Sequence, residues 1–179
     1  ASSTTWWIKA LDTSDSYSTT AASAVLTVGG AAAPTTNGSF AGENFILNWG
    51  AVNGSLTTAV YEVRYGTTSS TWATATSLGT VKGTTLTTKA AWAGVRRFFV
   101  AAVDIIGTVG TSNYFDAIVV APTQPTIAAQ VIDNNVLLQW NDCTQTLPIA
   151  SYELRKGATW ATATVIGSKQ GRFTSVFEV

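Results

Sequence analysis

The chain has 179 residues, 46% of them hydrophobic, and its ten basic and ten acidic side chains give a net charge of zero. Without clustered Lys and Arg it lacks the positive surface that neutralises a phosphate backbone, so we expect no nucleic-acid partner. No stretch reaches the roughly 18 apolar residues of a membrane-spanning helix, so we expect no membrane insertion.

The first predicted strand covers residues 6–11, where apolar side chains recur with a period of two. Trp6 and Ile8 fall on one face, which we expect to form part of a core. Trp7 falls on the opposite face. It is expected either to lie under neighbouring side chains of an outer sheet, which is the interpretation we favour, or to contact another chain.

A Gly-Gly-Ala-Ala-Ala-Pro junction at residues 29–34 precedes a longer series of predicted strands. Three of these strands lie at residues 45–49, 61–65 and 98–104. The core residues that their alternation predicts are Trp49, Tyr61, Phe98 and Val100. Phe99 falls on the outer face, as Trp7 does, and the same two interpretations apply to it: cover by neighbouring side chains, which we favour, or a contact with another chain.

The pattern returns after a second junction at residues 121–125, and the return reveals an internal repeat. The blocks at 45–49 and 61–64 recur at 136–140 and 152–155, both with a shift of 91 residues. The block at 72–76 recurs at 160–164 with a shift of 88, and the block at 6–12 recurs at 98–104 with a shift of 92. Trp140 and Tyr152 are therefore expected in a core, like Trp49 and Tyr61.

No segment combines a helical period with helix caps, and the repeat predicts about seven short strands per module. The predicted fold class is all-β, with tandem immunoglobulin-like sandwiches. Residues 1–30 are expected to hold the last two strands of one module, and residues 34–121 a complete module. Residues 125–179 are expected to hold the first five strands of a further module.

The repeated blocks resemble fibronectin type III modules. Trp49 and Trp140 match the Trp of that family's second strand, and Tyr61 and Tyr152 match the Tyr that opens its third strand. The sixth-strand pattern matches Phe98 to Asp104 and also Trp6 to Asp12. The family's tyrosine-corner position falls on Thr4 and Arg96, so the corner hydrogen bond is expected to be absent.

Two segments, Trp6–Ser18 and Tyr152–Gly167, resemble modules of central tail fibre and tip-attachment (host-specificity) proteins of long-tailed bacteriophages. That resemblance implies a stiff spacer in the phage tail of the virion, which positions parts that bind a host receptor. It implies as partners copies of the chain, in a homotrimer or head to tail, and other tail proteins. The alternative is an extracellular spacer or adhesive module of a bacterial glycoside hydrolase or surface filament protein.

Residues that could carry chemistry are few. The chain has no His and a single cysteine, Cys143, so we expect no catalytic triad, no metal site and no cofactor, and we expect that the chain is not an enzyme. Asp12 and Asp104 recur at the same position of the repeat and are expected to bond local turn amides. Trp72 and Trp160 are expected to pack against a sheet edge rather than to bind sugars.

The two partial modules together have the length of one complete module. Two explanations are open at this point. The sequence is either a two-repeat window from a longer array, or separate chains complete one another head to tail. In both, Trp6 and Ile8 are expected to pack on a core that contains Trp140 and Tyr152.

Overall fold

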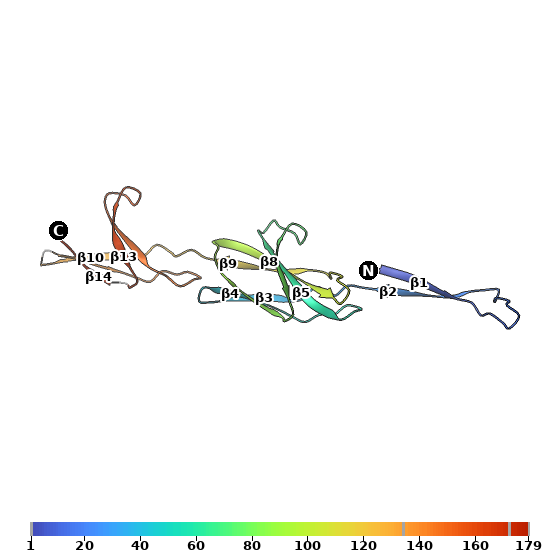
Figure 1. The fold of residues 1–179 in the computed structure, drawn as a ribbon. Helices are drawn as coiled ribbons and strands as arrows, with labels where there is room; N and C mark the ends of the chain where they lie inside the picture. Colours follow the sequence, from blue (N-terminus) through green and yellow to red (C-terminus); the bar gives the residue numbers. More distant parts are fainter. Residues whose placement is uncertain (1, 134, 172, 179) are drawn as a thin grey trace. The chain divides into compact units, whose positions relative to one another are not determined.

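The computed structural model describes residues 2–133, 135–171 and 173–178. All regular secondary structure in these ranges is β, which confirms the predicted fold class (Figure 1). The strands are β1 (Ser2–Ile8), β2 (Ala22–Val28), β3 (Thr36–Ala41), β4 (Asn44–Trp49), β5 (Thr58–Gly66), β6 (Thr76–Val81), β7 (Thr85–Lys89), β8 (Gly94–Asp104), β9 (Asn113–Val119), β10 (Ile127–Ile132), β11 (Asn135–Trp140), β12 (Tyr152–Lys156), β13 (Thr164–Lys169) and β14 (Phe173–Glu178). None of the described residues forms a helix that could cross a membrane.

The middle module, residues 36–119, consists of two sheets with the strand orders β3-β4-β7 and β6-β5-β8-β9. In β4, Phe45, Leu47 and Trp49 are buried and alternate with half-buried Ile46 and Asn48. Period-two alternation of this kind gives each sheet one apolar face, and burying two such faces together makes a sandwich. The strand order is that of an immunoglobulin-like sandwich.

Strand β8 is buried on both of its faces, from Phe98 to Ala102. Phe98 and Val100 belong to the core, and on the outer face the ring of Phe99 lies 5.9 Å from the ring of Tyr114. Phe99 is 5% exposed, so it is not available as a contact for another chain. The physical reason is that β8 lies between β5 and β9, whose outer side chains cover it.

The N-terminal strands β1 and β2 form a two-stranded antiparallel sheet, with Ser2 opposite Val28 and Ile8 opposite Ala22. Trp6, Trp7 and Ile8 are 65%, 69% and 72% exposed. In the described chain Trp6 and Ile8 therefore lie outside a core, and their expected packing on a core that contains Trp140 and Tyr152 stays a prediction. The alternation defines the face on which they lie, but a core also needs a second sheet, and a lone hairpin has none.

The C-terminal unit, residues 122–178, repeats only part of the middle module. Its sheets have the orders β10-β11-β14 and β12-β13, which correspond to β3-β4-β7 and to the β5-β6 pair. Trp140 and Leu154 are buried, and Tyr152 is half-buried with its ring 5.4 Å from that of Trp140. Within the described residues this unit holds no counterpart of β8 and β9.

Arg96 occupies the tyrosine-corner position of the middle module. Arg96 places its guanidinium 4.8 Å from the centre of the Tyr65 ring. A cation above an aromatic face is attracted by the ring's quadrupole. This contact joins β8 to β5 at the end of their paired region.

Candidate interaction site

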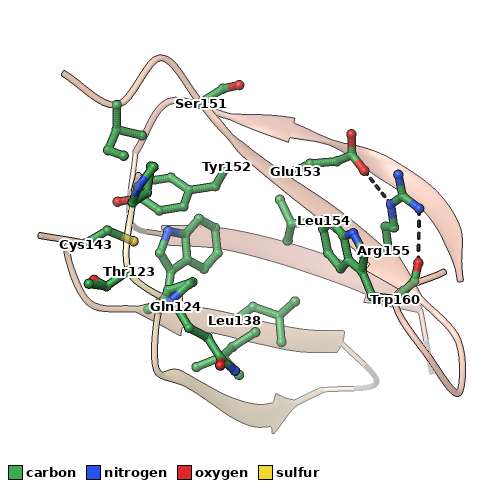
Figure 2. Close-up of a pocket in the computed structure, with 15 residues that line it drawn as sticks. Thr123, Gln124, Leu138, Cys143, Ser151, Tyr152, Glu153, Leu154, Arg155 and Trp160 are labelled. Atoms are coloured by element: carbon green, nitrogen blue, oxygen red, sulfur yellow. Dashed lines mark hydrogen bonds and ion pairs between the residues drawn. The ribbon is translucent and has the colours of Figure 1, made fainter. Parts of the chain in front are cut away.

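The C-terminal unit contains a cleft of about 640 Å³ between its two sheets (Figure 2). The apolar side chains that line it come from both sheets and from the loops between them. They include Ile127, Leu138, Trp140, Ile149 and Leu154. In the middle module the corresponding space is occupied by the inward side chains of β8, and no described strand of the C-terminal unit takes that place.

At the floor of the cleft, Tyr152 lies beside Trp140 and Cys143. Cys143 lies beside Tyr152 at the position that Val52 takes beside Tyr61 one repeat earlier, where the Val52 amide donates to the Tyr61 hydroxyl at 3.0 Å. Burial raises the pKa of the Tyr152 phenol, and the neighbouring Cys143 thiol raises it further. Cys143 is a buried free thiol that packs with Tyr152 and Trp140 at the floor of the cleft.

The rim of the cleft carries a cluster of Glu153, Arg155 and Trp160 (Figure 2). The Arg155 Nε donates to Glu153 Oε1, and its Nη1 donates to the Trp160 carbonyl oxygen at 3.1 Å. The guanidinium lies 4.6 Å from the centre of the Trp160 ring, which is 63% exposed. A planar guanidinium suits both tasks because it donates in its plane and stacks through its face.

The same cluster exists in the middle module. Arg64 Nε donates to Glu62 Oε1 at 2.8 Å, Arg64 Nη1 donates to the Trp72 carbonyl at 2.9 Å, and the guanidinium lies 4.5 Å from the Trp72 ring centre. Sequence reasoning expected only that Trp72 packs against a sheet edge. The signal was present, because both repeats combine Glu-x-Arg with a following Trp, but the stacking depends on how the loop folds back.

The edge of β12 that borders the cleft corresponds to an edge of β5 that is paired in the middle module. In the middle module β5 pairs with β6 on one side and with β8 on the other. The second pairing places Tyr61 opposite Ala102, Val63 opposite Val100 and Tyr65 opposite Phe98. Strand β12 pairs with β13, and among the described residues no strand occupies its second edge.

The β1–β2 hairpin has the same turn as the β8–β9 hairpin. Asp12 Oδ1 accepts hydrogen bonds from the amides two and four residues further along, at 2.8 and 3.0 Å. Asp104 Oδ1 does the same at 3.0 and 2.8 Å. Both carboxylates therefore bond local turn amides, as predicted. The left-handed turn position is Asp15 in one hairpin, with φ 62°, and Gly107 in the other, with φ 86°.

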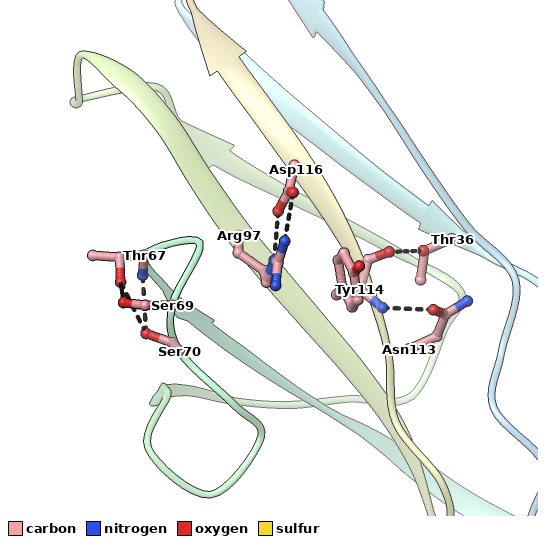
Figure 3. Close-up of polar contacts among 8 residues, drawn as sticks. All are labelled: Thr36, Thr67, Ser69, Ser70, Arg97, Asn113, Tyr114 and Asp116. Carbon is pink, nitrogen blue, oxygen red and sulfur yellow. Dashed lines mark hydrogen bonds and ion pairs between the residues drawn. The ribbon is translucent and has the colours of Figure 1, made fainter.

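Polar groups on the outer face of the middle module bond to one another (Figure 3). Arg97 donates from Nε and Nη2 to the two carboxylate oxygens of Asp116, at 2.7 and 2.8 Å, and lies 3.9 Å from the Tyr114 ring centre. The bidentate bond holds the pKa of Asp116 below its usual value and raises that of the Arg97 guanidinium. Around it, Thr36 donates to the Tyr114 carbonyl at 2.8 Å. Because these polar groups bond to one another within the module, this face of the sheet is consistent with a structural role.

The described residues contain no group of three or more His, Cys, Asp or Glu side chains arranged to hold a metal ion. The predicted core residues Trp49, Tyr61, Phe98, Val100 and Trp140 are buried, and Tyr152 is half-buried beside the cleft. Trp7 is exposed on the hairpin. The structure thus separates the predicted residues into those of a closed core, an open cleft and an uncovered hairpin.

No protein-family model matches the sequence. No curated protein matches it either. Among solved structures, the chain is similar to the FN1–FN3 domains of chicken CNTN1, with 13% sequence identity and a TM-score of 0.40 over 98% of this chain and 67% of that chain. The strand order of the middle module defines its fold.

Proposed function

We propose that the chain is a segment of a stiff spacer built from fibronectin type III-like modules. The observation that carries this proposal is a two-bond link that occurs twice. The Gly29 amide donates to Ser55 Oγ at 2.9 Å, and the Ser55 amide donates back to the Gly29 carbonyl at 3.0 Å. One repeat later, Val120 and Thr146 exchange the same two bonds at 2.8 and 3.3 Å.

Each link joins the end of one hairpin to a loop of the repeat that follows it in the sequence. Because the linker backbone is hydrogen-bonded, it differs from the solvated, freely rotating backbone of a Gly- and Ser-rich flexible linker. Close packing adds to the first link, since a Cβ on Gly54 would lie 2.7 Å from the Gly29 oxygen and the Ala31 nitrogen. A spacer that transmits position needs junctions of this kind.

The spacer belongs, in this proposal, to a bacteriophage tail fibre or tail tip protein and holds receptor-binding parts away from the tail. The support is the likeness of Trp6–Ser18 and Tyr152–Gly167 to modules of such proteins. Its partners would be other tail proteins and copies of the chain. The second candidate, an extracellular spacer of a bacterial enzyme or surface filament protein, draws on the same module type.

Immunogold electron microscopy with antibodies raised against the 179-residue chain distinguishes the two candidates. The phage proposal predicts label on the tails of purified virions, at the fibre or the tip. Label confined to the bacterial surface or to secreted protein, with none on virions, would overturn it and favour the second candidate.

A further inference from the structure

We propose that the cleft of the C-terminal unit is a docking site for the β1–β2 hairpin of a second copy of this chain. The hairpin would add its β1 antiparallel to the unpaired edge of β12 and so complete the sandwich. The inference rests on the duplication of the module and not on the phage assignment, so each can fail without the other.

The backbone argument is that β12 offers an edge and β1 offers a strand. In the described residues the second edge of β12 has no partner strand, and its amides and carbonyls can form a ladder with an added strand. Strand β1 has one ladder, to β2, and its other edge is likewise unpaired in the described chain. The β8–β9 hairpin occupies the equivalent edge of β5, and it has the same turn as β1–β2.

The register follows from the two repeat shifts. Val63 lies opposite Val100 in the middle module. Its equivalent in β12 is Leu154, and the equivalent of Val100 is Ile8, so Leu154 would lie opposite Ile8. Trp6 would then take the place of Phe98. Both side chains would enter the apolar cleft, which explains why the hairpin presents them to solvent in the described chain.

The outward side chains are complementary in the same register. Glu62 and Arg64 lie opposite Ala101 and Phe99 in the middle module. The docked equivalents place Lys9 opposite Glu153, which pairs opposite charges across the strands. They also place Trp7 opposite Arg155, beside the Arg155–Trp160 stack. Slipping the register by one residue would turn Trp6 and Ile8 outward and lose the charge pair.

The symmetry of the contact decides what kind of assembly it makes. Each copy supplies one hairpin and one cleft, so the two surfaces that meet are different. A heterologous contact of this type propagates into a filament unless its rotation closes a ring. The exposed apolar side chains of Trp6, Ile8 and Val25 would be covered in either case, as their equivalents Phe98, Val100 and Ala117 are in the middle module.

Cysteine cross-linking between single-site variants tests the register. In a Cys143→Ala background, Lys9→Cys protein is mixed with Glu153→Cys protein under mild oxidation, and the linked peptides are identified by mass spectrometry. The proposal predicts a Lys9–Glu153 disulfide as the main product between the two proteins. The matched control replaces Glu153→Cys by Lys169→Cys, because Lys169 lies on β13, across β12 from the docking edge. At least a tenfold lower yield is expected.

Two outcomes would overturn the proposal. Equal cross-linking at Glu153 and Lys169 would show random collision. A Lys9→Cys/Glu153→Cys double variant that closes within one chain at all concentrations, while the mixed single variants do not link, would show that the occupant is not a second copy. Light scattering gives an independent readout. The average molar mass of the unmodified protein should increase with protein concentration, and the Ile8→Asp variant should remain a monomer.

Discussion

The middle module and the C-terminal unit contain the same core residues but differ in how well those residues are covered. The tilted rings of Trp49 and Tyr61 have centres 5.6 Å apart and both residues are buried, while those of Trp140 and Tyr152 have centres 5.4 Å apart with Tyr152 only half-buried. Trp72 is half-buried in its Arg stack, and Trp160 is exposed. Among the described residues, the difference between the two regions is the presence of β8 and β9 in the middle module. It shows that this hairpin is the part that closes the sandwich.

The largest expected effect comes from removing the central Trp of the closed module. Trp49→Ala should destabilise that module by about 3–5 kcal/mol, because it removes a buried aromatic side chain and leaves a cavity. Trp140→Ala should cost less, since its surroundings are open on one side and can relax. Denaturant unfolding followed by hydrogen exchange reads each region separately.

Trp7→Ala serves as the control for that comparison. Trp7 is exposed, so in the isolated monomer its removal should change the free energy of unfolding by less than about 0.5 kcal/mol. If Trp7→Ala proved more costly than Trp49→Ala, the assignment of inward and outward faces would be wrong.

Next in size is the packing of the first link. Gly54→Ala should destabilise the middle module by about 1–3 kcal/mol, because the new Cβ would lie 2.7 Å from backbone atoms of residues 29–31. Gly83→Ala is the matched control, since its Cβ would meet nothing within 4 Å. Thermal unfolding of both variants measures the difference, and equal melting temperatures would contradict the tight junction.

A smaller effect is expected from the Arg97–Asp116 pair. The folded-state pKa of Asp116 lies below the unfolded value of 3.8. The stability that the pair contributes is therefore present above pH 3.8 and is lost as pH falls through the lowered pKa of Asp116. Since the Asp116 side chain is about a third exposed, the contribution is about 1 kcal/mol or less. Asp116→Asn should flatten the acid side of the stability profile. Glu43→Gln, in the exposed pair with Lys89, should not.

The smallest effect concerns the cleft itself. Burial raises the pKa of Tyr152 above its usual 10.0, so the folded state keeps this proton longer than the unfolded state. The C-terminal unit should therefore lose a little stability as pH rises from about 10 towards the higher folded pKa. In the Tyr152→Phe variant that part of the alkaline loss should vanish. An unchanged alkaline profile would show that Tyr152 is not the group responsible.

Sequence alternation was sufficient to place Trp49, Tyr61 and Phe98 in a core, because a strand with one apolar face must bury it. It could not show that Trp6 and Ile8 are exposed here, since the period gives the face and not the presence of a second sheet. The Asp12 and Asp104 turns were predictable because an Asp side chain bonds amides close to it in sequence. The Arg155–Trp160 stack was not, because it depends on a loop returning over its own strand.

Hydrogen exchange of β12 as a function of protein concentration tests most directly whether a hairpin from another copy completes the C-terminal sandwich. Strand β5, which is already paired on both edges, serves as the internal reference. The account predicts that exchange in β12 and β1 slows together as concentration rises, while exchange in β5 does not change. Exchange in β12 and β1 that is independent of concentration would contradict it.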